Sequence, residues 1–234
     1  EFHGKGKGRS GAARQQDRYR PLGRPEVLKV LQSQDMLPAI TFIFSRAGCD
    51  GALYQCLRSR MVLTSQEEAQ QIKEIVDAGV EGIPEEDLQV LDFKRWREAL
   101  SRGFAAHHAG MLPAFRHIVE DLFVRGLVRA VFATETLALG INMPARTVVL
   151  EKLIKFNGEA HVDLTPGQYT QLTGRAGRRG IDTLGNAVVQ WAPAMDPRQV
   201  AGLASTRTYP LISTFAPGYN MAINLLGMLG FEDS

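Results

Sequence analysis

The chain has 234 residues and a net charge of only +2, and 44% of its residues are hydrophobic. This composition is typical of a globular protein with a sizeable core, and it excludes a uniformly polycationic nucleic-acid binder. No apolar run reaches the length of about 18 residues that a membrane-spanning helix needs, and the start of the chain has no secretory signal. We therefore expect a cytoplasmic protein without a membrane partner.

The basic residues are unevenly distributed along the chain. Residues 1–24 hold seven basic and two acidic residues and almost no large apolar side chains. Because such a segment cannot bury enough surface to offset the entropy lost on ordering, we expect a flexible basic linker or tail. Its GKGKGRS stretch faintly resembles a phosphate loop but lacks both the GxxxxGK[ST] spacing and a preceding strand.

From residue 25 onwards, strands are predicted to alternate with helices. Short apolar runs rich in β-branched and aromatic residues predict buried strands at residues 39–44, 104–107, 128–133, 147–150 and 186–191. Capping signals and apolar periodicity predict helices at residues 46–57, 65–76, 84–102, 113–125 and 166–176. The alternation predicts an α/β fold, in which a doubly wound parallel sheet carries helices on both faces and functional loops at the carboxyl ends of its strands.

Two further features concern the cysteines and the last residues. Cys49 and Cys56 lie seven residues apart on one predicted helix, too far apart for a disulfide, so we expect free, buried thiols. Residues 216–234 are apolar and are predicted to begin a helix that stops abruptly. We expect them to be the truncated start of a following domain.

The strongest functional signal is the sequence QLTGRAGRRG, which begins at Gln171. On a continuous helix Gln171, Arg175 and Arg178 would share one face, while Gly174 and Gly177 would each cost about 1 kcal/mol relative to alanine. We expect close approach of a partner surface to offset that cost. Arginines fixed on such a face bind phosphate bidentately and stabilise charge on a transferred phosphoryl group, although a solvated basic helix end is the simpler alternative.

The same sequence resembles motif VI of superfamily 2 helicases. Other stretches follow in the order of that family: TFIFSR (residues 41–46) resembles motif IV, ATETLALGINMPA (133–145) resembles motif V, and AHHAGM (106–111) resembles the loop between them. The resemblance is strongest to the Ski-type DExH RNA helicases, and within them to the actinobacterial HelY-type proteins.

This resemblance implies a RecA-like fold and a division of the chain. Residues 25–215 are identified as a second RecA-like domain, the helicase C-terminal domain. Residues 1–24 would be the linker from the first RecA-like domain, and residues 216–234 would enter a winged-helix-like domain.

The resemblance also assigns roles on the nucleotide side. It implies that Arg175 and Arg178 act catalytically on the phosphates of ATP. Gln171, Gly140 and Asn142 would approach the nucleotide. Closure of the two RecA-like domains on ATP would bring the arginines to the phosphates.

The expected contacts with single-stranded RNA are Ser45, Arg46 and His108 and, as the resemblance implies, Thr134 and Glu135. Small hydroxyl groups and backbone N–H groups directly after a strand suit contacts with the sugar–phosphate backbone. Two simpler alternatives remain, in which Thr134 and Thr136 only cap the next helix and Arg46 is solvated.

The neighbouring histidines His107 and His108 do not predict a metal site. Adjacent side chains on a strand point in opposite directions, and no cysteine or aspartate lies at metal-ligand spacing. A structural role or one facing nucleic acid is expected, and we expect no protein-bound metal in this chain.

Neither GxxxxGK[ST] nor DExH occurs in the sequence. In the family these motifs hold ATP and Mg²⁺ on the first RecA-like domain, so this chain alone is expected to be inactive. The expected partners are that domain, RNA-degradation machinery and single-stranded RNA, for example as a 3′ overhang. The alternatives are a DNA-directed repair helicase and a passive nucleic-acid-binding module.

Overall fold

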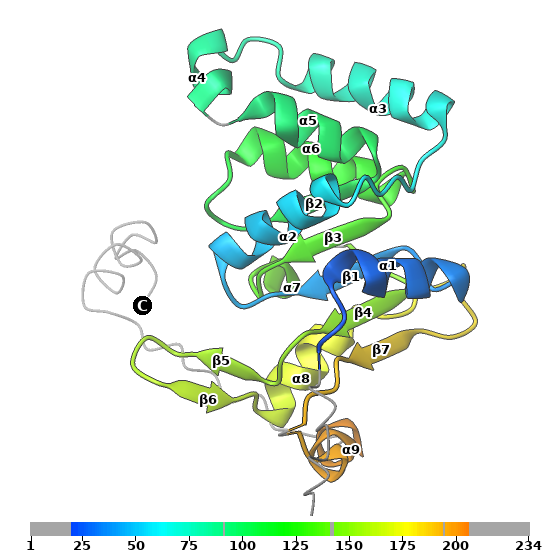
Figure 1. Ribbon diagram of the computed structural model, residues 1–234, viewed down its shortest axis with the longest axis vertical. Coiled ribbons are helices and arrows are strands. Elements are labelled where there is room, and N and C mark those ends of the chain that lie inside the picture. The colour runs from blue at the N-terminus through cyan, green and yellow to red at the C-terminus, as the bar shows by residue number, and fades with distance from the viewer. Residues whose placement is uncertain (1–19, 91, 141–142, 194, 206–234) are drawn as a thin grey trace, which may run out of the picture.

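A five-stranded parallel sheet organises the computed structural model, which describes residues 20–90, 92–140, 143–193 and 195–205 (Figure 1). The strand order is β2-β3-β1-β4-β7, and every neighbouring pair is parallel. These strands are β1 (Ala39–Phe42), β2 (Phe104–His107), β3 (Ala130–Ala133), β4 (Thr147–Leu150) and β7 (Asn186–Val189). The predicted parallel α/β sheet is confirmed, with three strands shorter than their apolar runs.

Side chains from the central strands alternate between two buried clusters. In β1, Ile40 and Phe42 belong to one cluster and Ala39 to the other; in β3, Val131 belongs to the first and Phe132 to the second. All five are at most 1% exposed. Because successive side chains of a strand point to opposite faces, this sheet needs an apolar cover on both sides.

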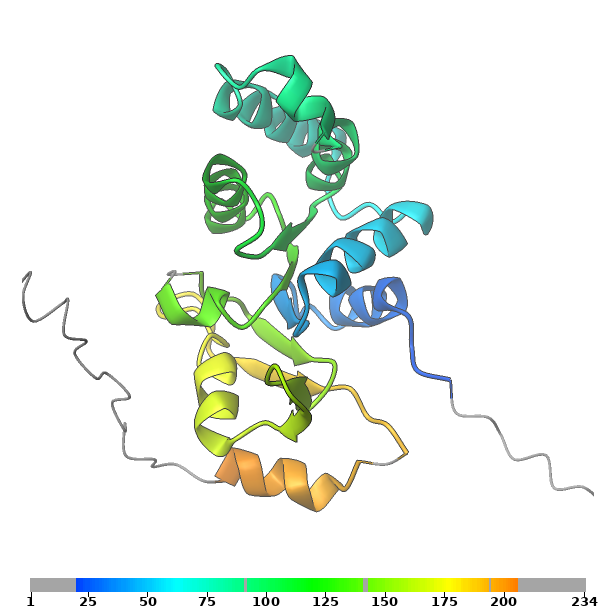
Figure 2. The same ribbon diagram turned by 90° about the vertical axis from the view of Figure 1, so that its left-hand side faces the viewer.

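Helices supply that cover, as predicted. Figure 2 shows α1 and α2 on one side of the sheet and α6, α7 and α8 on the other. The helices of the described residues are α1 (Arg24–Ser33), α2 (Arg46–Arg58), α3 (Gln66–Gly79), α4 (Glu85–Val90), α5 (Phe93–Ser101), α6 (Pro113–Val124), α7 (Leu137–Gly140), α8 (Pro166–Thr173) and α9 (Pro197–Ser205). The helix-covered sheet is the RecA-like architecture expected from the sequence.

The region between α2 and β2 forms a helical layer beyond the β2 edge of the sheet (Figure 1). Ser65 caps α3 in the predicted capping box, with its Oγ accepting a hydrogen bond from Glu68 N at 3.2 Å. The helical structure predicted at residues 84–102 is confirmed, and a left-handed residue, Asp92 (φ 51°), divides it into α4 and α5. Trp96 of α5 stacks on Phe115 of α6 with ring centroids 4.1 Å apart. The layer thereby joins the main core.

Two ordered segments were absent from the sequence prediction. Helix α1 begins at Arg24, inside the segment expected to be a linker, and the Arg24 guanidinium pairs with Glu151 through hydrogen bonds of 2.6 and 3.0 Å. Strands β5 (Ile154–Phe156) and β6 (His161–Asp163) form an antiparallel hairpin. The Asn157-Gly158 pair in its turn is the sequence signal that predicts such a hairpin.

The remaining expectations divide by position. Cys49 and Cys56 both lie on α2 and are free and buried, as predicted. Burial raises the pKa of each thiol to about 12. Residues 216–234 and most of 1–24 lie outside the described residues. None of the helices in the described ranges is long and apolar enough to cross a membrane.

Candidate functional site

The side chains expected to bind nucleic acid follow three adjacent strands. Ser45 and Arg46 come after β1, Thr134 and Glu135 after β3, and His108 after β2. Because these strands are parallel neighbours, their carboxyl ends meet at one edge of the sheet. We call the loops of residues 43–46, 108–112 and 134–136 the carboxyl edge. The structure brings all five residues to it.

Ser45 and Arg46 start helix α2 at this edge, and both are exposed. The Ser45 Oγ accepts a hydrogen bond of 2.9 Å from Gly48 N, so this hydroxyl group caps the helix. Arg46 reaches the loop after β2, where a side chain built at Gly110 would come within 3.4 Å of Arg46 Nη1. Arg46 thus supplies an exposed positive charge between two loops.

His108 is buried in this edge, contrary to a direct role in nucleic-acid binding. Its side chain is 7% exposed, and its Nε2 lies 3.0 Å from Asp50 Oδ1. The Nδ1 atom accepts a hydrogen bond of 3.2 Å from Gly110 N, which leaves Nε2 as the protonated nitrogen that donates to Asp50. Since both ring nitrogens have partners in the protein, His108 orders its loop instead of presenting a free ring.

His107 is buried and pairs with a residue of α6, which fits a structural role. Its Nε2 lies 2.8 Å from Glu120 Oε1, and its side chain is 3% exposed. Burial lowers the pKa of His107, against the opposing effect of Glu120. Within the part of the chain that the structure describes, no three His, Cys, Asp or Glu side chains form a group that could hold a metal ion.

Glu135 connects the carboxyl edge to the β5–β6 hairpin. Its Oε2 accepts a hydrogen bond of 2.8 Å from Lys155 Nζ, and the Lys155 side chain is 15% exposed. The Thr134 and Thr136 hydroxyl groups lie 3.0 Å apart, and Thr134 O accepts a bond from Leu137 N at the start of α7. The loop after β3 is therefore ordered by contacts on both sides.

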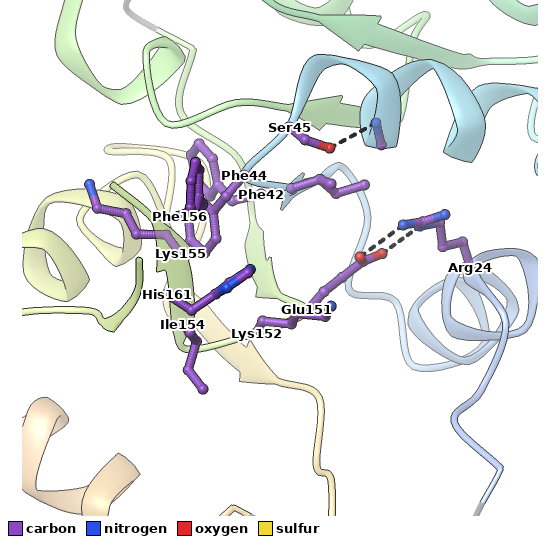
Figure 3. A pocket seen from close by; sticks show the side chains of 12 residues that line it. Arg24, Phe42, Phe44, Ser45, Glu151, Lys152, Ile154, Lys155, Phe156 and His161 are labelled. Atoms are coloured by element: carbon purple, nitrogen blue, oxygen red, sulfur yellow. Dashed lines mark hydrogen bonds and ion pairs between the residues drawn. The ribbon is translucent and has the colours of Figure 1, made fainter. Parts of the chain in front are cut away.

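A cavity of about 330 Å³ lies between the β1 loop and the hairpin. Figure 3 shows Phe44 and Ser45 on the side of the β1 loop, and Phe156 and His161 on the hairpin. The rings of Phe156 and His161 lie 5.4 Å apart. Aromatic surfaces beside lysines provide the stacking and charge contacts that single-stranded nucleic acids use.

The arginine sequence does not lie on one helix, and this prediction is wrong. Helix α8 ends at Thr173, with Gly174 as its C-cap, and Gly177 adopts a left-handed conformation with φ at 88°. Of the three candidate residues, Gln171 lies on the helix, and Arg175 and Arg178 follow its end. We call residues 174–185 the arginine segment.

The glycines of this segment allow a close contact within the protein, whereas a partner surface was expected. A Cβ at Gly185 would lie 2.5 Å from Gly177 N, which no side chain tolerates. Gly177 N also donates a hydrogen bond of 2.7 Å to Ala145 O, and Ala176 pairs with Ala145, two residues before β4. The segment is thus fixed to the amino end of β4 through its backbone.

Arg178 is held by Asp182 in a bidentate pair. Its Nε and Nη2 atoms each donate a hydrogen bond of 2.8 Å to the two carboxylate oxygens, and its backbone N donates one of 3.0 Å. The Asp182 side chain is 1% exposed and that of Arg178 is 24% exposed. The hydrogen bond from Arg178 lowers the pKa of Asp182 to about 2.

The other residues expected on the nucleotide side lie in this segment, in α7 and α8, and outside the described residues. The Arg175 Nη2 atom donates a hydrogen bond to Ala138 O in α7, the helix whose last residue is Gly140. Gln171 is exposed on the last turn of α8. Asn142 lies outside the described residues.

Sequence reasoning missed three charged residues that contact the carboxyl edge or the arginine segment. Lys155 pairs with Glu135, Asp182 pairs with Arg178, and Arg146 Nε lies 3.5 Å from Asp182 Oδ1. The four-residue spacing of Arg178 and Asp182 was visible in the sequence. That spacing indicates an ion pair only on a helix, and the predicted helix ended before Arg178.

Comparison with known proteins identifies the class of this domain. Residues 52–180 match the family described as the helicase conserved C-terminal domain. The chain therefore belongs to the helicase C-terminal domain family, and its parallel sheet is the RecA-like sheet of that family.

Relatives of this chain are named helicases, and two of them are named DExH-box ATP-dependent RNA helicases. The chain is 67% identical over 212 residues to the probable helicase HelY of Mycobacterium tuberculosis, which covers 91% of this chain and 23% of that protein. It is 35% identical over 205 residues to the antiviral helicase SKI2 of Saccharomyces cerevisiae, covering 86% and 16%. It is also 35% identical over 201 residues to the exosome RNA helicase MTR4 of Homo sapiens, covering 86% and 19%. The predicted resemblance to Ski-type and HelY-type helicases is confirmed.

The chain spans less than a quarter of the length of these relatives. What the family match shows of this chain is a helicase C-terminal domain.

Proposed function

We propose that this chain is the second motor domain of an ATP-dependent RNA helicase. It supplies the arginine side of a composite ATP site and one wall of the path for single-stranded RNA. The observation that carries the proposal is Arg178, whose guanidinium group is fixed edge-on by Asp182 in a segment pinned to β4.

The residues of the arginine segment fit the phosphates of a nucleotide. Two of the five guanidinium N–H groups of Arg178 bind Asp182, so the Nη1 end remains to donate to a phosphate oxygen. Arg175 lies beside α7 and Gly140, where the nucleotide is expected. ATP supplies the phosphoryl group whose transfer to water drives the domain motion.

Mg²⁺ belongs on the other side of the composite site. The described residues contain no group of three potential metal ligands, and the sequence contains neither GxxxxGK[ST] nor DExH. The first RecA-like domain would hold the ion and the phosphate loop. Closure of that domain onto the arginine segment would complete the site, and opening after hydrolysis would shift the grip on RNA.

The carboxyl edge would hold the RNA backbone. Arg46 offers an exposed charge between two loops, and Thr134 offers a hydroxyl group at the next strand. Contacts of this kind bind phosphates without reading sequence. RNA is favoured over DNA as the substrate because relatives of this chain are named RNA helicases, and the name of MTR4 also favours RNA-degradation machinery as a partner.

The test is the ATPase activity of the full-length protein with and without single-stranded RNA, beside this chain alone. We expect RNA to stimulate the full-length protein and the isolated chain to be silent. ATP hydrolysis by the isolated chain would overturn the composite site. Strand separation on matched RNA and DNA duplexes with 3′ overhangs then tests the substrate, and preference for DNA would contradict the RNA assignment.

A further inference from the structure

The Asp182 carboxylate contacts two guanidinium groups and one backbone N–H group. It accepts two hydrogen bonds from the Arg178 guanidinium and one from the Arg178 backbone. A second guanidinium, that of Arg146, lies 3.5 Å from its Oδ1. With a side chain that is 1% exposed, Asp182 is a buried anion between two cations.

The backbone places this carboxylate without a helix. Ile181 N and Asp182 N both donate hydrogen bonds to Arg178 O, at 3.1 and 2.9 Å, so the chain turns back on Arg178. Gly180 allows this turn with a φ of 78°. The turn sets the carboxylate against one edge of the guanidinium plane.

Arg146 anchors the same carboxylate to the sheet. Arg146 directly precedes β4, and its Nη1 also donates a hydrogen bond of 2.7 Å to Asp35 Oδ2 in the loop before β1. Arg146 O accepts a bond of 3.0 Å from Asn186 N at the start of β7. Through Arg146, the position of Asp182 is therefore fixed relative to β1, β4 and β7. The same holds for any side chain that Asp182 orients.

A bidentate carboxylate fixes a guanidinium in both position and plane. Arginine is otherwise a long, flexible side chain that loses rotamer entropy when it is ordered. Donors that are already aimed at developing charge need no reorganisation during the reaction. A planar fork held at Nε and Nη2 directs its Nη1 end along one line.

We propose that Asp182 is a positioning residue that aims Arg178 at the terminal phosphate of ATP. This inference rests on the proposed function of Arg178. Asp182 itself touches neither the nucleotide nor the water. A purely structural role is the competing explanation, in which the pair stabilises the turn and nothing else.

The experiment measures kcat and KM for ATP in the full-length protein, stimulated by single-stranded RNA. It compares the wild type with Asp182→Ala, Arg178→Ala and the double variant. We expect Asp182→Ala to lower kcat by about tenfold to 100-fold, the effect of a misplacement of about 1 Å, with KM changed by less than about threefold. We expect the double variant to be as slow as Arg178→Ala alone, because Asp182 acts through Arg178.

Either of two results would overturn the inference. One is a kcat of Asp182→Ala within about threefold of the wild type. The other is a double variant in which the two losses multiply, since Asp182 would then act independently of Arg178. If Asp182→Ala melts below the assay temperature, Asp182→Asn replaces it under the same criteria, because it keeps the volume of the side chain.

The matched control is Asp121→Ala. Asp121 pairs with Arg125 at the same four-residue spacing, with a 2.9 Å hydrogen bond, but on an exposed surface of α6. Its removal should leave kcat unchanged. Full turnover by Arg178→Ala would instead contradict the proposed function itself, and so the two failures are distinguishable.

Discussion

The carboxyl edge and the arginine segment hold their charged side chains in different ways. At the edge, Arg46 is exposed, and the Ser45 hydroxyl group caps its own helix. In the arginine segment, Arg178 is fixed by a buried carboxylate on a backbone that admits no side chain at Gly185. A moving nucleic-acid backbone tolerates adaptable contacts, whereas a single phosphoryl group needs donors that are set in advance.

The largest predicted effect is on the kcat of ATP hydrolysis, which should distinguish the arginine segment from the carboxyl edge. In the full-length protein, Arg178→Ala should lower the kcat of ATP hydrolysis by about 10³-fold, the usual contribution of an arginine that stabilises the transferred phosphoryl group. Arg46→Ala should leave kcat at saturating RNA within about twofold, because it acts on RNA binding. Steady-state ATPase assays measure both.

The control for folding is Arg178→Lys, which keeps the charge and loses the bidentate fork. We expect it to be nearly as slow as Arg178→Ala while remaining folded by circular dichroism. A kcat loss in Arg46→Ala as large as that in Arg178→Ala would erase the distinction between the regions.

The next effect concerns the backbone of the arginine segment. Gly185→Ala should lower the free energy of unfolding by about 2 kcal/mol, because its Cβ would meet the backbone of Gly177 and Ala176. Gly51→Ala is the matched control, since Gly51 lies in α2 with nothing within 4 Å of an added Cβ. It should stabilise the protein by up to about 1 kcal/mol. Urea unfolding of both variants decides, and equal stabilities would mean that the close contact is not rigid.

A smaller effect tests the adaptable contacts of the carboxyl edge. Arg46→Ala should weaken the binding of single-stranded RNA by about fourfold at 0.15 M salt and reduce the salt slope by about 0.7, as expected for one lost phosphate contact. Fluorescence anisotropy over a salt series measures both quantities. His108→Gln, which keeps a polar side chain in the buried position, should leave the salt slope unchanged. An unchanged slope in Arg46→Ala would remove Arg46 from the RNA path.

The smallest effect is the pH dependence of the Arg178–Asp182 pair. The pKa of Asp182 is lowered from 3.8 to about 2 by the hydrogen bond from Arg178. A carboxyl group with a lowered folded-state pKa stabilises the fold fully above its unfolded-state pKa, and this contribution is lost as the pH falls through the folded-state value. The stability advantage of the wild type over Asp182→Asn should therefore be complete near pH 5 and shrink between about pH 4 and pH 2.

Urea unfolding at several pH values measures this advantage. Asp121→Asn is the control at an exposed ion pair, and it should change the free energy of unfolding by less than about 1 kcal/mol. An advantage of the wild type over Asp182→Asn that stays constant down to about pH 2 would contradict the pairing.

The sequence predicted well those elements that a short stretch of residues is enough to recognise. Runs such as AITF and TVVL predict buried strands because both faces of the sheet are covered. Ser65 and Glu68 predict the start of α3 because the capping contacts lie within one turn. The five residues of the carboxyl edge follow from the strands, since parallel strands bring their ends together.

The arginine segment was less predictable because its contacts are not local. Gly177 reads as a costly residue in a helix until Gly185 and Ala145 are placed against it. Asp182 becomes a partner of Arg178 only after the turn at Gly180 replaces the helix. The role of His108 was hard to predict for the same reason, because its partner Asp50 lies 58 residues away in the sequence, on α2.

The most direct test of the arginine segment is nucleotide binding by the full-length protein. The affinities for ADP and for a non-hydrolysable ATP analogue are measured by isothermal titration calorimetry in the wild type and in Arg178→Ala. If Arg178 meets the terminal phosphate, the variant should bind the ATP analogue about tenfold more weakly, the value of one hydrogen bond to a charged group, and should bind ADP as the wild type does. Equal affinities of the two proteins for the ATP analogue would contradict the placement of Arg178 in the ATP site.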